Sequence, residues 1–247
     1  MHLLVVNPNS TRSMTDALRA NVPEYFKEQG VTFTYFTGPA SAPPQIDGPE
    51  SSRESTDACL PPLTEHDAAT GLPYFDTFDG VLIACFSNHP LVHELQSRSV
   101  AATPVLGIFH ASIQYALSIN RPFSIITSNK EWVTLLDSAV DSILGGGRPV
   151  IWKGTVSSNV QVLDLHDPKL FDAIVKRIRS ENVQALRSEV IILGCAGFSG
   201  LEGKFQSRFK PEEGVFQFVD SVVIGLELLA STCRFNAEYK RRVEAAK

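Results

Sequence analysis

The sequence lacks an excess of positive charge. It has 22 lysine and arginine residues against 27 aspartate and glutamate residues, a formal net charge of −5. A surface that binds nucleic acid or an anionic membrane needs clustered basic residues. The one basic cluster, Lys240-Arg241-Arg242, is typical of a solvated helix end. We therefore expect a protein that binds neither nucleic acid nor membrane.

The sequence also lacks a long uninterrupted apolar run. Its longest apolar segment near the C-terminus, residues 215–230, contains Gln217, Asp220 and Glu227, which indicates a core element rather than a membrane span. The first apolar run begins at Leu3, which leaves no room for a charged leader and a separate secretory segment. These features predict a cytoplasmic protein.

Cysteine is scarce, with four residues in 247. The four form no CxxC pair and no regular framework, so we expect free thiols rather than disulfides. Cys59 and Cys233 have no distinctive context and are interpreted as incidental. Cys85 and Cys195 share a context, because each ends a short β-type apolar run and precedes small or polar residues.

The stretches around Cys85 and Cys195 resemble each other. They read VLIACFSNHPL over residues 81–91 and VIILGCAGFSGL over residues 190–201. A short apolar run followed by turn residues is typical of a buried parallel strand. Each cysteine would then lie at the carboxyl end of a strand, which is the edge where open α/β sheets bind ligands.

The two halves of the chain repeat three strand-turn-helix units in the same order. Residues 4–9 correspond to 124–129, the Cys85 unit to the Cys195 unit, and residues 105–110 to 216–220. Alternating strands and helices predict parallel sheets. We therefore expect an α/β fold of two pseudo-symmetric lobes, each a parallel-sheet α/β sandwich, with the active site in the cleft between them. Residues 1–107 plus 218–247 are assigned to the first lobe, and residues 108–217 to the second.

Local patterns predict the individual elements. We expect strands over residues 31–36 and 123–127, and helices over residues 12–21, 90–98, 130–144 and 168–186. A further helix over residues 221–230 is expected to be capped by Asp220. Residues 37–62, rich in Pro, Ser, Gly and acidic residues, predict a structureless segment that is either a functional lid or a disordered insertion. A short helix is expected after it, over residues 64–72.

Two thiols on opposite walls of one cleft form a two-base arrangement. A proton taken from one face of a carbon and returned to the other inverts a stereocentre, which requires one deprotonated and one protonated group. We expect the helix N-terminus after each strand, with the amides of residues 86–88 and 196–198, to favour thiolate and to stabilise a developing oxyanion. Such a reaction requires no cofactor and no metal.

Other interpretations of these residues stay open. Cys85, His89 and His93 are spaced four residues apart and could bind zinc on one helix face, although Pro90 argues that Cys85 precedes the helix. His89 could instead contact a substrate or cap the helix, and His110 could contact the cleft or lie at its surface. Cys85 and Cys195 could also form a reversible disulfide, or hold a ligand, in a non-catalytic protein.

The motifs Asn7-Pro8-Asn9-Ser10-Thr11, Ala84-Cys85 and Gly194-Cys195-Ala196-Gly197, in this order and spacing, resemble the aspartate/glutamate/hydantoin racemase superfamily. The segment CFSNHPL resembles fungal-type members of its hydantoin and allantoin racemase branch, and the similarity runs along nearly the whole chain. The resemblance implies cofactor-independent inversion at C5 of a 5-substituted hydantoin, with Cys85 and Cys195 as the two acid/bases. It also implies that the cleft is lined at strand ends by Asn7, Ser10, Ser87, Asn88, Thr127, Ser128, Gly197 and Phe198.

Allantoin is the favoured substrate, because purine nitrogen salvage handles both of its enantiomers. Amino-acid racemisation, or a one-cysteine isomerase or decarboxylase reaction of the same superfamily, is the alternative. The presence of two cysteines favours the two-base reaction, and the Asn-Thr or Thr-His pairs that usually follow the cysteines of amino-acid racemases are absent here. We also expect a small-molecule substrate and a homo-oligomer.

Overall fold

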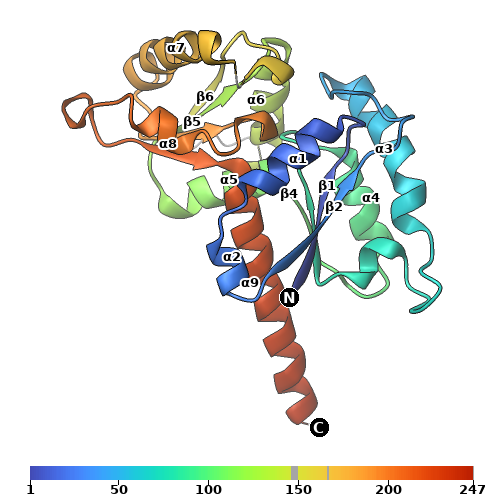
Figure 1. Cartoon of the computed structure of the whole chain (residues 1–247). Helices are drawn as coiled ribbons and strands as arrows, with labels where there is room; N and C mark the ends of the chain where they lie inside the picture. Colours follow the sequence, from blue (N-terminus) through green and yellow to red (C-terminus); the bar gives the residue numbers. More distant parts are fainter. Residues whose placement is uncertain (146–149, 166, 247) are drawn as a thin grey trace.

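Two parallel sheets of the same topology form the centres of two α/β lobes (Figure 1). The computed structural model describes residues 1–145, 150–165 and 167–246. Within these residues, the strand order is β2-β1-β3-β4 in the first sheet and β6-β5-β7-β8 in the second, so the second repeats the first strand for strand. The predicted α/β fold of two pseudo-symmetric lobes is confirmed.

The bounds of the elements are as follows. The strands are β1 (His2–Asn7), β2 (Thr32–Thr37), β3 (Gly80–Ile83), β4 (Val105–Gly107), β5 (Phe123–Thr127), β6 (Trp152–Ser157), β7 (Val190–Leu193) and β8 (Gln217–Asp220). The α-helices are α1 (Arg12–Asn21), α2 (Tyr25–Glu28), α3 (Pro49–Thr64), α4 (Pro90–Arg98), α5 (Ile108–Ile119), α6 (Glu131–Ile143), α7 (Pro168–Arg177), α8 (Glu202–Gln206) and α9 (Ser221–Ala245). Short 3₁₀ turns cover Tyr74–Thr77, Val162–Asp164, Ala196–Phe198 and Pro211–Glu213, and a π-helical segment, Ile178–Ala185, continues α7.

The central strands of both sheets are apolar along almost their whole length. β3, β5 and β7 are buried at every position, and β1 at every position after His2. Parallel sheets need helices on both faces, so their central strands are runs of buried residues rather than alternating ones. Their carboxyl ends meet at one edge of each sheet, and the two cysteine-containing turns follow β3 and β7 there.

One of the apolar clusters joins the two sheets. One cluster of buried residues includes Leu3 and Leu82 of the first sheet together with Phe123 and Ile192 of the second. Helices α5 and α9 pack on each other, and α9, which follows β8 of the second sheet, also packs on β3 and β4 of the first. This packing is consistent with placing α9 in the first lobe, whereas β8, which ends at Asp220, pairs with β7 of the second sheet. The division of the chain into residues 1–107 plus 218–247 and residues 108–217 stays a proposal.

The proline-rich segment contains a helix that the sequence analysis missed. Residues 49–64 form α3, so the prediction of a structureless segment over residues 37–62 is wrong. Pro49 stands in the first turn of this helix, where its missing N–H costs nothing, and Ser51 Oγ accepts from the N–H of Gly48 at 3.1 Å. Cys59 and Leu63 are fully buried on the inner face of α3. The helix predicted over residues 64–72 is also wrong, because the chain turns there through a bridge between His66 and Pro73.

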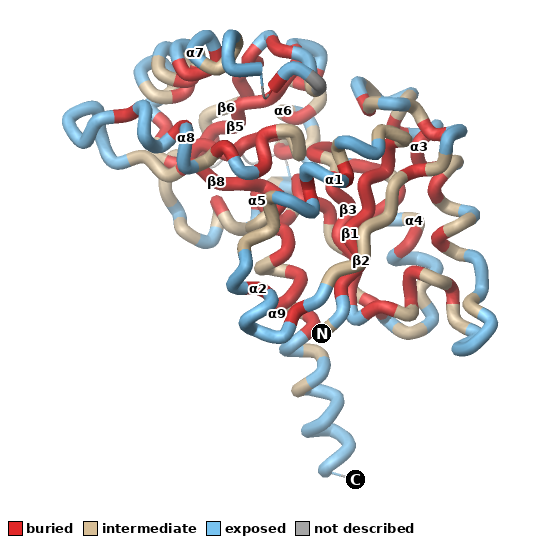
Figure 2. The backbone as a smooth tube through the Cα atoms, viewed as in Figure 1, coloured by how far each residue is buried: buried red, intermediate tan, exposed pale blue. Residues whose placement is uncertain are grey.

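The last helix is longer than its apolar pattern predicts. α9 continues past Ala230 to Ala245, and its end projects from the body of the protein with exposed residues (Figures 1 and 2). Lys240, Arg241 and Arg242 are exposed there, as expected of a solvated helix end, and Glu238 pairs with both arginines. Among the helices that the structure describes, none has the length and apolarity needed to cross a membrane.

Candidate active site

The backbone holds Cys85 and Cys195 in equivalent positions. Ala84 donates its N–H to the carbonyl of Val6 at 2.8 Å, and Gly194 donates its N–H to the carbonyl of Ile126 at 2.8 Å. Each bond ties the residue before a cysteine to the neighbouring central strand. The repeat found in the sequence is therefore a repeat of backbone geometry at the carboxyl edge of each sheet.

Both thiols line one small cavity between the lobes. The cavity has a volume of about 40 Å³. Its lining is made of Pro8, Asn9, Ile46, Ala84, Cys85, Phe86, Thr127, Ser128, Trp132, Val162, Gly194, Cys195 and Ala196. No charged side chain stands among these described lining residues. The site is thus a narrow, uncharged chamber with two sulfur atoms, and both cysteines are partly exposed.

Each thiol has a hydrogen-bonding neighbour two residues further along the chain. Cys85 Sγ lies 3.5 Å from Ser87 Oγ, and Gly197 donates its N–H to Cys195 Sγ at 3.3 Å. Burial raises the pKa of Cys85 to about 12, although the contact with Ser87 opposes this. Burial also raises the pKa of Cys195 to about 11, against the opposing hydrogen bonds from Gly197 and Ser128. The hydrogen bonds of the turns favour the thiolate, but desolvation outweighs them, so the pKa of each thiol is raised.

The glycine before Cys195 has a steric role. A Cβ on Gly194 would lie 2.3 Å from Cγ2 of Ile125 and 3.0 Å from the carbonyl oxygen of Ile126. Any larger residue would therefore push the turn away from β5. The Gly-Cys pair lets the chain pass close to the central strand, and so fixes where Cys195 enters the chamber.

The Asn-Pro-Asn turn after β1 is shaped by a buried amide. Asn7 Nδ2 donates to Asn9 Oδ1 at 3.0 Å, to the carbonyl of Thr11 at 3.2 Å and to Thr15 Oγ1 at 3.0 Å. Asn7 is therefore turned away from the chamber, and its bonds bring Pro8 and Asn9 to the chamber wall. Ser10 is also absent from the described lining and donates its backbone N–H to the carbonyl of Pro43.

A buried polar cluster on α3 and α4 supports the same turn. Ser55 Oγ and Cys59 Sγ both donate to the carbonyl of Pro8, at 2.6 and 3.3 Å. His89 Nδ1 caps α4 by accepting from the N–H of Leu91 at 3.3 Å, and its Nε2 lies 3.4 Å from Ser55 Oγ. Burial lowers the pKa of His89 to about 4, so this imidazole is neutral at physiological pH. Of the two roles left open for His89, the structure shows the cap.

The second lobe supports its equivalent turn in the same way. Ser128, which corresponds to Pro8 in the repeat, accepts at its carbonyl from Ser157 Oγ at 2.7 Å and from Ser158 Oγ at 3.1 Å. Thr127 Oγ1 donates to the carbonyl of Gly194 at 3.1 Å, which ties this turn to the one that contains Cys195. In both lobes, therefore, two side-chain donors fix the carbonyl that follows the first strand of the repeat.

The match to known proteins agrees with this geometry. The model of the Asp/Glu/Hydantoin racemase family matches residues 3–229. The chain belongs to this family. It is 45% identical over 239 residues to protein DCG1 of Saccharomyces cerevisiae, and the alignment covers 94% of this chain and 96% of that protein. It is 30% identical over 206 residues to a hydantoin racemase of Rhizobium meliloti, covering 83% of this chain and 80% of that protein.

Solved structures show the same fold. The structure of allantoin racemase from Pseudomonas fluorescens superposes with a TM-score of 0.77 at 24% sequence identity, covering 96% of this chain and 92% of that one. The family and these similarities support the hydantoin and allantoin branch recognised from the motifs, and identify the protein as an isomerase of the racemase type.

Apart from Asn7 and Ser10, which are absent from the described lining, the predicted binding residues fall into three groups. Thr127 and Ser128 line the chamber with the cysteines. Ser87 and Asn88 line an adjacent pocket of about 340 Å³, here called the outer chamber. Phe198 is fully buried in the core of the second lobe, while Gly197 acts through its bond to Cys195.

Three apolar residues of the chamber wall were not identified from the sequence. Ile46 precedes α3, Trp132 lies in the first turn of α6, and Val162 follows β6. They reach the chamber only because the lobes dock, and no motif marks them. Of the three, Trp132 is the residue that the sequence could have singled out, because the chain has only two tryptophans.

The zinc alternative finds no support in the site geometry. His93 is exposed on α4 while Cys85 faces the chamber. Among the described residues, no group of three or more His, Cys, Asp or Glu side chains could hold a metal ion. His110, the other histidine considered for the cleft, is not among the described residues that line the chamber.

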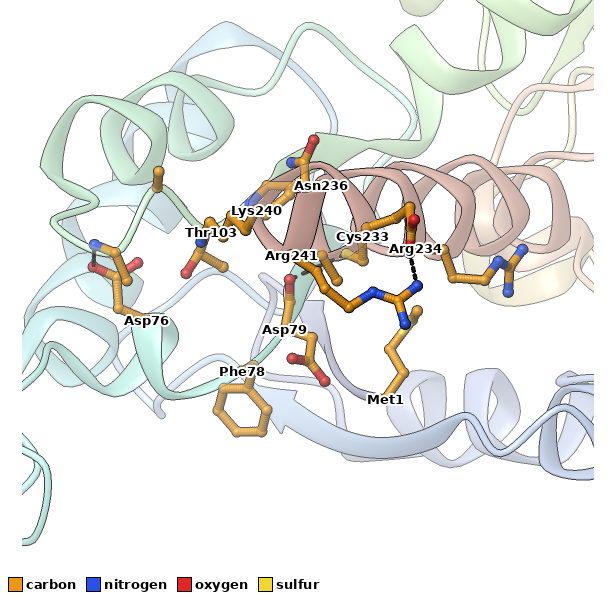
Figure 3. Close-up of a pocket in the computed structure, with 15 residues that line it drawn as sticks. Met1, Asp76, Phe78, Asp79, Thr103, Cys233, Arg234, Asn236, Lys240 and Arg241 are labelled. Atoms are coloured by element: carbon orange, nitrogen blue, oxygen red, sulfur yellow. Dashed lines mark hydrogen bonds and ion pairs between the residues drawn. The ribbon is translucent and has the colours of Figure 1, made fainter. Parts of the chain in front are cut away.

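A larger pocket lies at the amino edge of the first sheet, away from the two thiols (Figure 3). It has a volume of about 650 Å³ and lies between α9 and the segments that lead into β1, β3 and β4. Its one cysteine, Cys233, donates from Sγ to the carbonyl of Asp79 at 3.1 Å. Burial raises the pKa of Cys233 to about 11. This pocket has no second thiol in its described lining, so the smaller chamber is the candidate active site.

Proposed function

We propose that the protein is a cofactor-independent racemase that inverts C5 of 5-substituted hydantoins by a two-cysteine mechanism, with allantoin as the favoured substrate. One observation carries the proposal: Cys85 and Cys195, from two lobes, line a single chamber whose described lining is uncharged. Family membership and the similarity to hydantoin racemases support it.

The reaction follows from the two sulfur atoms. One cysteine, as thiolate, removes the proton from C5 and becomes a thiol, while the electron pair of the C–H bond moves toward the neighbouring carbonyl. The other cysteine, as thiol, then delivers its proton to the opposite face and becomes the thiolate. Asn9, Thr127 and Ser128 supply hydrogen-bonding groups for the polar edge of the ring. The reverse direction exchanges the roles of the two cysteines.

The uncharged lining favours a hydantoin over an amino acid. A free amino acid carries an ammonium and a carboxylate group, and each must find a charged or strongly hydrogen-bonding partner when it leaves water. A hydantoin ring presents only neutral amide and carbonyl groups. The chamber therefore favours the cyclic substrate over the amino-acid alternative.

The chamber is narrow and is lined by residues of both lobes. A movement of the lobes toward each other would close it on a bound ring. Closure then excludes water from C5, which strengthens the polar interactions within the chamber.

The decisive experiment follows the C5 proton. Enantiopure allantoin and 5-isobutylhydantoin are incubated in D₂O with wild type, Cys85→Ser or Cys195→Ser, and the C5–H signal and the optical rotation are followed together. We expect wild type to exchange and racemise both compounds above the spontaneous rate, and each variant to lose racemisation by at least about 10³-fold, as for residues that act as a unit.

A matched control separates catalysis from folding. Cys233→Ser replaces a thiol of the remote pocket and keeps a donor for the carbonyl of Asp79, so it should racemise at the wild-type rate. Wild type that gives no acceleration with any hydantoin would contradict the proposed substrate class. Rapid formation of one disulfide between Cys85 and Cys195 under mild oxidant, without racemisation, would favour the redox alternative.

A further inference from the structure

The outer chamber adjoins the active site. It is lined by Pro49, Ser52, Arg53, Ser87, Asn88, Pro90, Trp132, Leu135, Leu136 and Ala139. Trp132 lines both cavities, so it forms part of the wall between them. Ser87 also connects them, because its hydroxyl lies 3.5 Å from Cys85 Sγ. The outer chamber therefore begins one side chain away from a catalytic sulfur.

The two lobes give the outer chamber unlike walls. The N-terminal part of α3 and the turn after β3 contribute Arg53, Ser87 and Asn88, which are polar or charged. Helix α6 of the second lobe contributes Trp132 together with Leu135, Leu136 and Ala139. A ligand in this space therefore meets a polar wall on one side and an apolar wall on the other.

The polar wall contains a positively charged side chain, that of Arg53. Arg53 is the charged side chain in the described lining of the outer chamber, and no ion pair of Arg53 occurs within the described part of the chain. Ser52 Oγ is engaged with the carbonyl of Gly48 at 2.8 Å. The guanidinium of Arg53 and the exposed amide of Asn88 thus remain as donors at this wall. Guanidinium groups recognise carbonyl and carboxylate oxygens through paired N–H donors.

Resting on the proposed function, we propose that the outer chamber is the subsite for the 5-substituent of the substrate. Arg53, with Asn88, recognises a substituent that ends in an oxygen acceptor, either a ureido carbonyl or a carboxylate. With C5 between Cys85 and Cys195, the ring fills the inner chamber and the substituent passes Trp132. Leu135 and Leu136 pack on its carbon atoms, and Arg53 binds its polar end.

The test measures substrate preference rather than activity alone. Rates of C5 exchange are compared for allantoin, for 5-(2-carboxyethyl)hydantoin and for 5-isobutylhydantoin, which lacks an acceptor. Arg53→Met keeps the length of the side chain but removes its donors. We expect it to lower kcat/KM for the first two compounds by about 10- to 100-fold, the usual effect of losing a charge-assisted hydrogen bond. The isobutyl compound should change by less than about twofold. Arg234→Met, in the remote pocket, should alter none of the three.

Asn88→Asp distinguishes the two kinds of acceptor. A carboxylate at this position repels a carboxyethyl group but can still accept from the N–H groups of a ureido substituent. We expect kcat/KM for the carboxyethyl compound to fall at least about tenfold more than that for allantoin.

The outcomes separate this subsite from the proposed function. Wild type that racemises the isobutyl compound, combined with Arg53→Met that lowers all three substrates equally or lowers none, would overturn the subsite and leave the racemase proposal intact. Wild type that racemises no hydantoin would overturn both. Loss confined to the two acceptor-bearing substrates supports the subsite, and unchanged thermal melting of Arg53→Met shows that the loss does not come from unfolding.

Discussion

The reaction should accelerate steeply with pH, because the desolvated thiols of the chamber resist ionisation. Burial raises the pKa of Cys195 to about 11 and that of Cys85 to about 12. A thiolate is the charged form, so a raised pKa means that activity grows on the alkaline side. For a pKa of about 11, the thiolate fraction is about 10⁻⁵ at pH 6 and about 10⁻³ at pH 8. The value of kcat/KM should therefore increase about tenfold for each pH unit over this range.

The assay is the initial loss of optical rotation of an enantiopure hydantoin at a concentration well below KM, since kcat/KM reports ionisation of the free enzyme. Spontaneous racemisation also rises with pH, and the double variant Cys85→Ser/Cys195→Ser provides the background at each pH. The first ionisation belongs to the pair of thiols rather than to one of them, so both enantiomers should give the same slope. A level profile between about pH 6 and about pH 8 would refute the reasoning, because it would require a thiolate already formed at neutral pH.

Two further predictions concern single side chains. Gly194→Ala places a methyl group against Ile125, so it should reduce the free energy of unfolding in urea by about 1–3 kcal/mol and slow C5 exchange by displacing Cys195. Gly203→Ala, where an added Cβ meets no atom within 4 Å, is the control and should do neither. Asp220→Ala removes the carboxylate that accepts from Val222 N–H at the start of α9 and from Ser199 Oγ. It should cost about 2–4 kcal/mol of unfolding free energy; Asp220→Asn, which keeps a cap acceptor, should cost less, and an equal loss would argue against capping.

Elements with strong local signals were predicted to the residue or close to it. The helix expected over residues 12–21 is α1, and the strand expected over residues 123–127 is β5. In both, turn residues border a segment with a clear apolar pattern. Helix α3 was missed because its local signals oppose helix formation, with Pro61 and Pro62 in its sequence. Burial of Cys59 and Leu63 against the first sheet stabilises helix α3 although its local composition disfavours a helix, since tertiary packing overrides propensity.

Part of the candidate site could likewise be predicted from the sequence, and part could not. Cys85 and Cys195 could be predicted because the sequence repeats the pattern of a strand end around each of them. The walls formed by Ile46, Trp132 and Val162 depend on how the lobes dock, which is a non-local property. The raised pKa values of the two thiols also depend on how the lobes dock. The local turn favours the thiolate, and the opposite lobe, which no local pattern describes, removes the water that would solvate it.

The layer formed by α5 and α9 couples the two halves of the repeat. Each half of the repeat ends in one of these helices, and they pack on each other within a core that contains residues of both sheets. The two halves therefore share one apolar cluster, in addition to the cluster that each half has of its own. A substitution in α9 acts on the first sheet as well as on the second. Substitutions in the turns and pocket walls can stay local to one half, whereas substitutions along this shared layer affect both halves.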